Sequence, residues 1–172
     1  MLRPLLARLR LRLAKTAPTP RAASSMVLDP SRLSVLHGPL QPHTRPGDTT
    51  HPTGFRRDGY CWGLADDVGE HYVAGVVTRE FLQFSKARGN DLSTPRPGFA
   101  GLAPGCRWCL CVARWAEALA ASARLGDGVV PRVDLAATAL DTLRSVRIED
   151  LQRFAVRDGE GEGDGGDAAP ER

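Results

Sequence analysis

The chain has 172 residues, of which 23 are basic and 20 acidic, and its formal net charge is +3. This length predicts one domain that is large enough to bury a core. The positive excess comes from the N-terminus, because residues 27–156 carry 15 basic and 14 acidic side chains. Without a strongly cationic domain, nucleic acid is not expected as a partner.

Residues 1–26 are expected to be an organellar targeting leader, removed or disordered in the mature protein. The first 25 residues contain five arginines, one lysine and no acid. Their leucines follow helical spacing at Leu2, Leu5, Leu6, Leu9 and Leu13. An Arg-rich amphipathic start is typical of import signals, whereas a start at Met26 would leave the protein in the cytoplasm. A short helix on a membrane surface is the alternative.

Residues 157–172 are expected to be a disordered acidic tail, since they carry six acids and five glycines but no large apolar side chain. Between the two ends, residues 27–156 are expected to form a single domain. The sequence contains no run of the ~18 apolar residues that a membrane span requires. No transmembrane segment is therefore expected, and the chain is interpreted as soluble.

Within the domain, strands are expected at 33–37, 71–77, 107–113 and 129–136, with a short one at 143–146. Helices are expected at 79–88, capped by Thr78 and ended by Gly89, at 113–125, ended by Gly126, and at 148–155. Segments 38–52 and 90–105 are rich in turn formers and are interpreted as long ordered loops. The irregular alternation predicts a small two-layer α+β domain of mixed short strands and about three helices.

Three of the four cysteines, Cys106, Cys109 and Cys111, lie within six positions. On a strand, Cys109 and Cys111 would share one face with Cα atoms roughly 6.6 Å apart. Two thiolates on one zinc ion must approach to under ~4 Å, so a regular strand separates them too far. The pattern favours thiols packed as small hydrophobic side chains. An imported protein is also not expected to carry a disulfide framework.

Two kinds of cysteine chemistry remain as alternatives. A zinc or iron site would draw on Cys61, Cys109, Cys111 and His43, but the chain lacks a second paired spacing of ligands. A nucleophilic site could pair Cys61 with His71, ten residues further on, and a redox site could use Cys109 with Cys111. The spacing of Cys106 and Cys109 lacks the following helix of thioredoxin-like sites.

A polar cluster follows the helix expected at 79–88. The candidate ligand-binding residues are Asp58, Arg88, Asn90, Asp91 and Arg107. One interpretation is a helix end followed by turns that side chains stabilise through backbone hydrogen bonds. The other is a pocket for an anion or a small polar ligand, with Arg88 and Arg107 as bidentate donors. No phosphate-binding glycine motif is present, so no nucleotide cofactor is indicated.

Several blocks of the sequence are specific enough to indicate a family. They are GPLQP (38–42), TGFRRDG-C (53–61), EFLQFSKARGNDLSTP (80–95), GLAPG-RWCLCVARWAEAL (101–119) and IEDLQRFA (148–155). Over residues 34–156 the chain resembles domain-of-unknown-function family 2237, small, mainly bacterial and cyanobacterial proteins with relatives in photosynthetic eukaryotes. The resemblance implies a small α+β fold and no assigned activity. It favours a plastid, whereas the Arg-rich leader favours a mitochondrion.

The resemblance also has departures. His43, Tyr60 and Ala74 stand where members of the family commonly carry thiols, and Cys106 stands where an acid is usual. Cys61, Cys109 and Cys111 match the family pattern. Ala74 could not replace a thiol ligand, so a many-thiol metal site is not implied for this chain.

Three functions remain open on these grounds. The first is a non-catalytic module that binds a small molecule or a protein, with a pocket formed by loops 54–71 and 89–107 over the strand at 107–113. The second is a thiol-dependent enzyme, hydrolytic or redox, and the third is a metal-binding protein. The partner is unknown, with a small-molecule ligand or a homo-oligomer as possibilities.

Overall fold

The computed structural model describes residue 29 and residues 32–157. The elements in chain order are β1 (Val73–Val76), α1 (Arg79–Ala87), β2 (Arg107–Leu110), α2 (Val112–Leu125), η2 (Asp127–Val129), β3 (Arg132–Val133), η3 (Leu140–Arg144) and α3 (Ile148–Arg153). Strands and helices are mixed in one small unit, which confirms the predicted α+β class. The leader expected at 1–26 and the tail from 158 onward lie outside the described residues.

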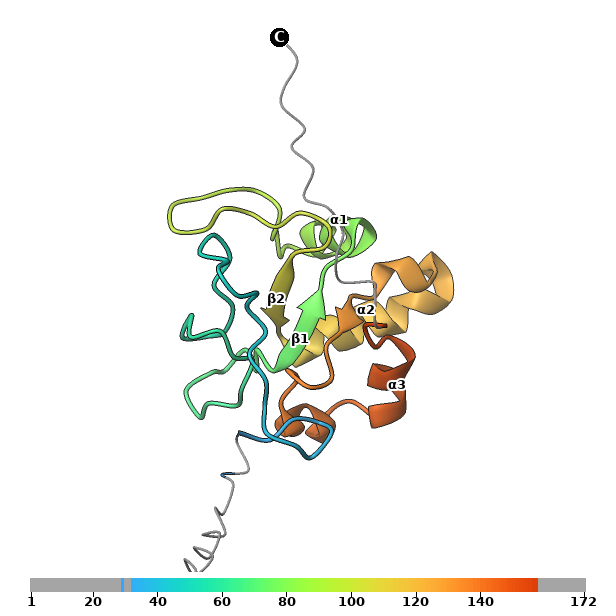
Figure 1. Ribbon diagram of the computed structural model, residues 1–172. Helices are drawn as coiled ribbons and strands as arrows, with labels where there is room; N and C mark the ends of the chain where they lie inside the picture. The colour runs from blue at the N-terminus through green and yellow to red at the C-terminus, as the bar shows by residue number, and fades with distance from the viewer. Residues whose placement is uncertain (1–28, 30–31, 158–172) are drawn as a thin grey trace, which may run out of the picture.

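The sheet has three antiparallel strands in the order β2-β1-β3. Val73 pairs with Leu110 and Ala74 with Cys109 in the β1–β2 register, and Gly75 pairs with Val133 between β1 and β3. Because β1 is central, β2 is an edge strand. Figure 1 shows the cyan-to-green part of segment 32–71 on one side of the β1–β2 pair and α2 and α3 on the other side, while the blue start of the segment runs below the strands.

The helix ends follow the sequence signals. Thr78 caps α1, and its side chain accepts a hydrogen bond from the Phe81 amide. Gly89 and Gly126 follow the ends of α1 and α2 with φ of 79° and 85°, values that a residue without a Cβ adopts at low cost. No helix among the described residues is long and apolar enough to cross a membrane.

Several expected strands are shorter or absent. The segment 33–37 forms only isolated bridges, and 143–146 overlaps η3 instead of forming a strand. The strand expected at 129–136 is reduced to β3, preceded by η2. Pro131 helps to explain this because proline has no amide hydrogen to donate to a ladder. The strand expected at 107–113 ends at Leu110 because α2 begins at Val112.

The core lies between the sheet and the helices. Its largest fully buried side chains include Trp115, Phe81, Phe154 and Leu151. The Trp115 indole donates to the Pro131 carbonyl and meets the Phe154 ring edge-on. These contacts fix α2 and α3 against the chain around β3.

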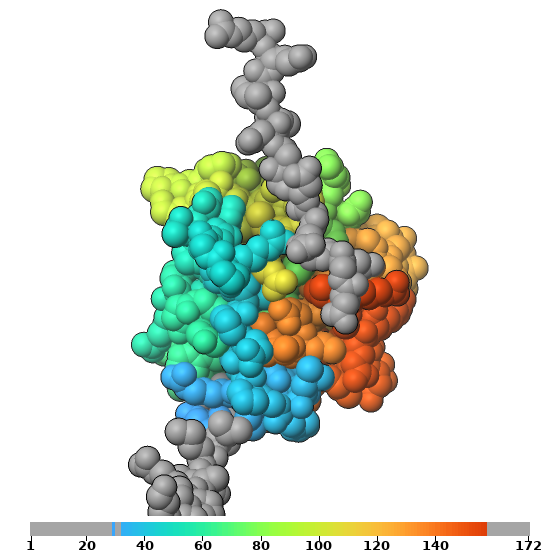
Figure 2. Space-filling view, viewed as in Figure 1, coloured from blue at the N-terminus to red at the C-terminus, as the bar shows by residue number. Residues whose placement is uncertain are grey.

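The N-terminal loops attach to the sheet through segment 136–140. The Val35 amide donates to the Thr138 carbonyl, the Gln41 amide to Ala136 and the Leu140 amide to Leu33. In the view of Figure 2 these loops form one continuous side of the molecule. Long loops held on a sheet in this way can present functional side chains in fixed positions.

Candidate active site

A disulfide joins Cys61 to Cys109, with Cα atoms 5.2 Å apart. The sequence was interpreted against a framework of disulfides and did not predict this single bond. Both cysteines are buried in a small cluster with Ala74 and Ala137. Ala74 lies opposite Cys109 in the sheet, and Cys61 forms a bridge with Thr138. Small side chains at 74 and 137 leave room for the two sulfurs, and this proximity depends on residues far apart in sequence.

The disulfide removes two of the expected thiol pairs. Because the Cys61 sulfur is bonded to Cys109, Cys61 is not a free nucleophile, which contradicts the alternative that paired Cys61 with His71. For the same reason Cys109 does not form a dithiol with Cys111. The two free cysteines are Cys106 and Cys111, both partly exposed.

His71 instead contacts Cys111. The Cys111 Sγ lies 3.2 Å from His71 Nε2, within hydrogen-bonding distance for sulfur. Cys111 is the residue that precedes the first turn of α2, with extended backbone angles of −58° and 134°. Its thiol is therefore at the N-terminus of a 14-residue helix. This position adds the positive end of the helix dipole to the environment of the sulfur.

Asp67 occupies the other side of the imidazole. Its Oδ1 lies 2.7 Å from His71 Nδ1, and its Oδ2 accepts the backbone amide of His71 at 2.7 Å. The Gly69 amide also donates to Oδ1. The Asp67 side chain is fully buried, whereas the His71 side chain is 33% exposed. A buried carboxylate bonded to both the ring and the backbone of His71 fixes the orientation of the ring.

The local backbone explains why His71 reaches Cys111. Glu70 has φ of 48°, a left-handed conformation that is unusual for a residue with a side chain. Its carbonyl accepts the amides of Tyr72 and Val112. Because Val112 directly follows Cys111, this second hydrogen bond holds the start of α2 next to His71. Gly69 is required here, since a Cβ at this position would lie 2.5 Å from His71 Cε1.

The charge state of His71 follows from these contacts. The pKa of His71 is raised from 6.5 to about 9, chiefly by the hydrogen bond with Cys111, while burial acts in the opposite direction. Asp67 also raises the pKa of His71, through a hydrogen bond and through its charge. At neutral pH the imidazole is therefore protonated and carries a positive charge between the thiol and the carboxylate.

This arrangement differs from a metal site. Asp67 and Cys111 contact opposite nitrogens of the ring, so the three side chains do not converge on one point. Among the described residues, no group of three or more His, Cys, Asp or Glu side chains has the geometry to hold a metal ion. His43, an expected ligand, is fully buried and contacts the Gly75 carbonyl, Arg107 and Asp134.

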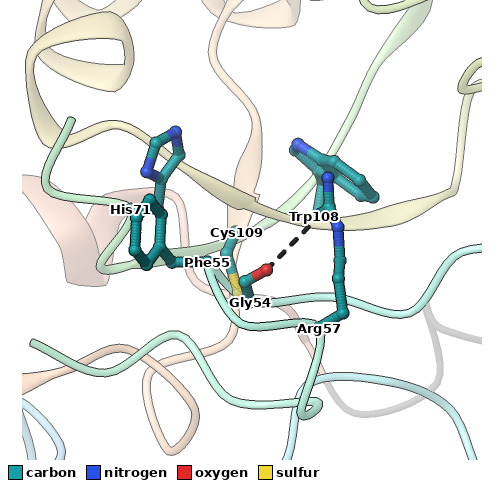
Figure 3. Close-up of a pocket in the computed structure, with 6 residues that line it drawn as sticks. All are labelled: Gly54, Phe55, Arg57, His71, Trp108 and Cys109. Carbon is teal, nitrogen blue, oxygen red and sulfur yellow. Dashed lines mark hydrogen bonds between the residues drawn. The ribbon is translucent and has the colours of Figure 1, made fainter. Parts of the chain in front are cut away.

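A cavity of 240 Å³ adjoins His71. It is lined by Gly54, Phe55, Arg57, His71, Trp108 and Cys109. Figure 3 shows His71 beside Phe55 at one end, Arg57 beside Trp108 at the other, and Gly54 with Cys109 between them. Cys111 does not line the cavity itself; its thiol contacts the lining residue His71.

The cavity differs from the pocket expected from the sequence. Loop 54–71 and strand β2 supply its walls, but the lining residues do not include any from 89–107.

The edge of β2 faces this space. Ala74 directs its amide to Thr138 and its carbonyl to the Asp134 amide, away from β2. In an antiparallel ladder, the amide and carbonyl of its partner Cys109 then point away from β1, toward the open edge.

The two arginines expected to bind an anion are engaged elsewhere. Arg88 pairs with Glu117 of α2 at 2.7 Å. Arg107 pairs with Asp134 at 2.9 Å and also contacts His43. The pairing of Asp134 with His43 and Arg107 lowers the pKa of Asp134 to about 2 although burial opposes this shift. The structure therefore does not assemble the expected pocket of Arg88 and Arg107.

The remaining candidates stabilise turns. Asp58 accepts the Tyr60 amide and the Trp62 indole N–H, and the Asn90 carbonyl accepts the Ser85 hydroxyl. Asp91 accepts from Ser93 and Thr94 and pairs with Lys86 at 3.0 Å; these hydrogen bonds hold its pKa well below the usual range. These contacts agree with the first interpretation of the polar cluster, in which its side chains stabilise turns.

Sequence reasoning did not select Asp67, Phe55, Arg57 or Trp108. One signal was available for Asp67, because it precedes His71 by four residues, a separation that a tight turn can close. The pairing of His71 with Cys111 and the cavity wall at Arg57 depend on contacts between distant segments, which no local pattern indicates.

Comparison with known proteins gives a family but no activity. The family model described as "Uncharacterized protein conserved in bacteria (DUF2237)" matches residues 33–155. This range contains every residue of the cavity and the Cys111–His71–Asp67 group. No curated protein matches the chain.

Proposed function

Because the chain belongs to the uncharacterised family DUF2237, we propose its function from the site itself: a thiol-dependent enzyme in which Cys111 is the nucleophile. The observation that carries the proposal is the contact of the Cys111 sulfur with His71 Nε2 while Asp67 contacts Nδ1. A nucleophile, a base and a group that orients the base are the three parts of nucleophilic catalysis by cysteine.

The surroundings of Cys111 are positively charged. A protonated imidazole and the N-terminus of α2 both place positive charge near the sulfur, as at the sites of nucleophilic cysteines. The proposed reactive form is the pair of a thiolate and a protonated imidazole, with Asp67 stabilising the positive charge on His71.

The reaction class is acyl transfer to water. The Cys111 thiolate forms a bond to the carbonyl carbon of the substrate, and the carbonyl electron pair moves to oxygen. When the intermediate collapses, the bond to the leaving group breaks and His71 donates its proton to that group. The resulting thioester on Cys111 is attacked by water, which neutral His71 deprotonates, and collapse releases the acid and restores the ion pair.

The first turn of α2 can stabilise the developing oxyanion. The amides of the first helical turn have no acceptors within their own helix. Val112 donates to Glu70, and Arg114 and Trp115 donate to Cys111. The Ala113 amide has no backbone acceptor among the residues that the structure describes. It lies near the nucleophile in sequence, where a donor could lower the barrier of acyl transfer.

Trapping the acyl-enzyme tests the proposal. The protein is mixed with 4-nitrophenyl acetate in a Cys106→Ser background, which leaves Cys111 as the single free thiol. We expect a burst of nitrophenolate and, by mass spectrometry, an acetyl group on Cys111. A Cys111→Ala variant should lose both, and His71→Gln should slow the burst by about a hundredfold. A burst that is retained in Cys111→Ala contradicts the proposal.

A binding module without catalysis is the second candidate, and the cavity beside β2 supports it. This candidate predicts that Cys111 remains unmodified in the trapping experiment although a small molecule occupies the cavity.

For localisation, we propose that residues 1–26 direct the chain to an organelle, as their arginines and the absence of acids suggest. Fusion of these residues to a fluorescent protein should give a mitochondrial or plastid signal. A diffuse cytoplasmic signal would contradict this proposal.

A further inference from the structure

We propose that the cavity beside β2 binds a small, flat carboxylic acid derivative, with its carboxylate on Arg57 and its reactive carbonyl toward Cys111. The proposal rests on the proposed function and adds the class of substrate. Its parts are a guanidinium at one end of the cavity, aromatic side chains along it and, at the other end, the imidazole of His71, whose Nε2 contacts the Cys111 thiol.

Arg57 has no carboxylate partner among the residues that the structure describes. Its guanidinium lies 4.5 Å from the centre of the Trp108 ring and donates weakly, at 3.4 Å, to the Gly54 carbonyl. The preceding residue, Arg56, differs because it pairs with Asp66 at 2.9 Å. A guanidinium that lines a cavity without a neutralising anion is a ready site for a carboxylate, which matches its paired N–H groups.

The backbone fixes Arg57 in this position. Arg57 has φ of 58°, and its amide donates to the Gly54 carbonyl to close a tight turn. Gly54 has φ of 93°, and a Cβ there would lie 2.5 Å from the Tyr60 carbonyl oxygen. A non-glycine residue in the left-handed region costs conformational energy, and such residues are frequent at binding sites. The turn presents Phe55 and Arg57 together to the cavity.

The aromatic walls select a flat group. Phe55 stacks on His71 with ring centres 6.0 Å apart and an angle of 19° between the rings. Phe55 is 45% exposed although it is large and apolar, so a bound ligand would cover it. The Trp108 ring borders the opposite end, under the guanidinium. The volume of 240 Å³ is below the 300–1,000 Å³ of typical drug-sized pockets, which limits the ligand to a small metabolite.

The charges favour a carboxylate over a phosphate ester. His71 lies between Asp67 and Cys111, and Arg57 contributes one further positive charge to the lining. One guanidinium balances one negative charge, as a carboxylate carries, whereas a phosphate monoester carries nearly two at neutral pH.

Two alkylating reagents test this inference in the Cys106→Ser background. One is 4-(iodoacetamido)benzoate, which has a flat ring and a carboxylate, and the other is the neutral N-phenyl iodoacetamide. In each case the Cys111 sulfur bonds to the methylene carbon and iodide leaves. The measured quantity is the ratio of the rate with the carboxylate reagent to the rate with the neutral one. We expect this ratio to be about tenfold larger for Cys111 than for N-acetylcysteine.

Variants of the two arginines separate the contributions. Arg57→Gln should abolish the preference for the carboxylate reagent. Arg56→Gln is the matched control and should keep the preference. Arg57→Lys preserves the charge without the paired donors and should retain part of the preference. The melting temperature of each variant shows whether that variant folds.

The outcomes distinguish this inference from the proposed function. If Cys111 reacts rapidly with both reagents and shows no preference, or if the preference survives Arg57→Gln, the carboxylate subsite is wrong and the thiol enzyme stands. If the neutral reagent reacts no faster than it does with N-acetylcysteine, the proposed function fails as well.

Discussion

His71 Nε2 lies 3.2 Å from the sulfur of Cys111, although the two residues are 40 positions apart in the sequence. The contact exists because the Glu70 carbonyl binds the Val112 amide and because Asp67 holds the opposite side of the ring. The same imidazole lines a cavity whose other residues have no part in the thiol contact. His71 therefore contacts both the proposed nucleophile and the cavity.

The titration of His71 should depend on Cys111. Its pKa of about 9 is due first to the hydrogen bond with that sulfur, so Cys111→Ala should lower it. Nuclear magnetic resonance of the ring protons across pH 5–10 measures the shift. An unchanged midpoint in Cys111→Ala would show that the sulfur does not bind the ring.

Protein stability should follow the same titration. Because the folded pKa of His71 is above its ordinary value of 6.5, its stabilising contribution is complete below pH 6.5 and is lost as the pH rises through about 9. The difference in free energy of unfolding between the protein and His71→Gln should therefore shrink between pH 6 and pH 10. Chemical denaturation at the two pH values provides this difference, and a difference that grows with pH contradicts the assignment.

Asp67→Asn should slow alkylation of Cys111 by about tenfold or more, since the amide cannot hold a protonated imidazole as a carboxylate does. The rate with iodoacetamide at pH 7 in the Cys106→Ser background is the measurement. Asp66→Asn is the control, because Asp66 is exposed and pairs with Arg56. Equal rates in Asp67→Asn and Asp66→Asn would show that Asp67 does not contribute to the reactivity of Cys111.

The disulfide should be visible in a count of thiols. Two thiols should react in the unfolded protein without reductant, and four after reduction, since Cys61 and Cys109 are bonded. Replacing both with alanine should lower the free energy of unfolding by about 2–4 kcal/mol, the usual effect of a cross-link across some tens of residues. Four reactive thiols before reduction of a freshly purified sample would contradict the bond.

Gly54→Ala should disturb the cavity more than Gly98→Ala does. Both glycines have positive φ, at 93° and 76°, so both substitutions carry the backbone cost of about 1 kcal/mol. A Cβ at Gly54 also meets the Tyr60 carbonyl, whereas nothing lies within 4 Å of one at Gly98. Thermal unfolding should therefore show a larger loss for Gly54→Ala, and similar losses would mean that the turn adjusts freely.

The helices could be predicted from the sequence because their signals are local. Thr78 before the helix at 79–87 and Gly126 after the helix at 112–125 act within one or two turns of the chain. The short strands were harder, since 33–37 has the alternation of a strand but meets its partners only through single bridges. Whether such a segment becomes a strand depends on the neighbours that the fold supplies.

The site shows the same division. Cys111 and His71 were both selected from their chemistry, but their pairing was not, because the loop position of Cys61 favoured it as the exposed thiol. The strand expected through residue 113 placed Cys111 inside a covered sheet. The structure ends β2 at Leu110 and begins α2 at Val112, so Cys111 lies at the junction and is partly exposed. Because the strand ends three residues earlier than expected, Cys111 is a candidate nucleophile and not a thiol packed in the core.

Whether Cys111 is an active thiol can be measured as its rate of alkylation by iodoacetamide between pH 5 and pH 9 in the Cys106→Ser background. The ion pair with His71 predicts a rate that is already high at pH 6 and exceeds that of N-acetylcysteine there by about tenfold or more, with the advantage lost in His71→Gln. A rate that rises in parallel with that of N-acetylcysteine, and is unchanged by His71→Gln, would contradict an active thiol at this site.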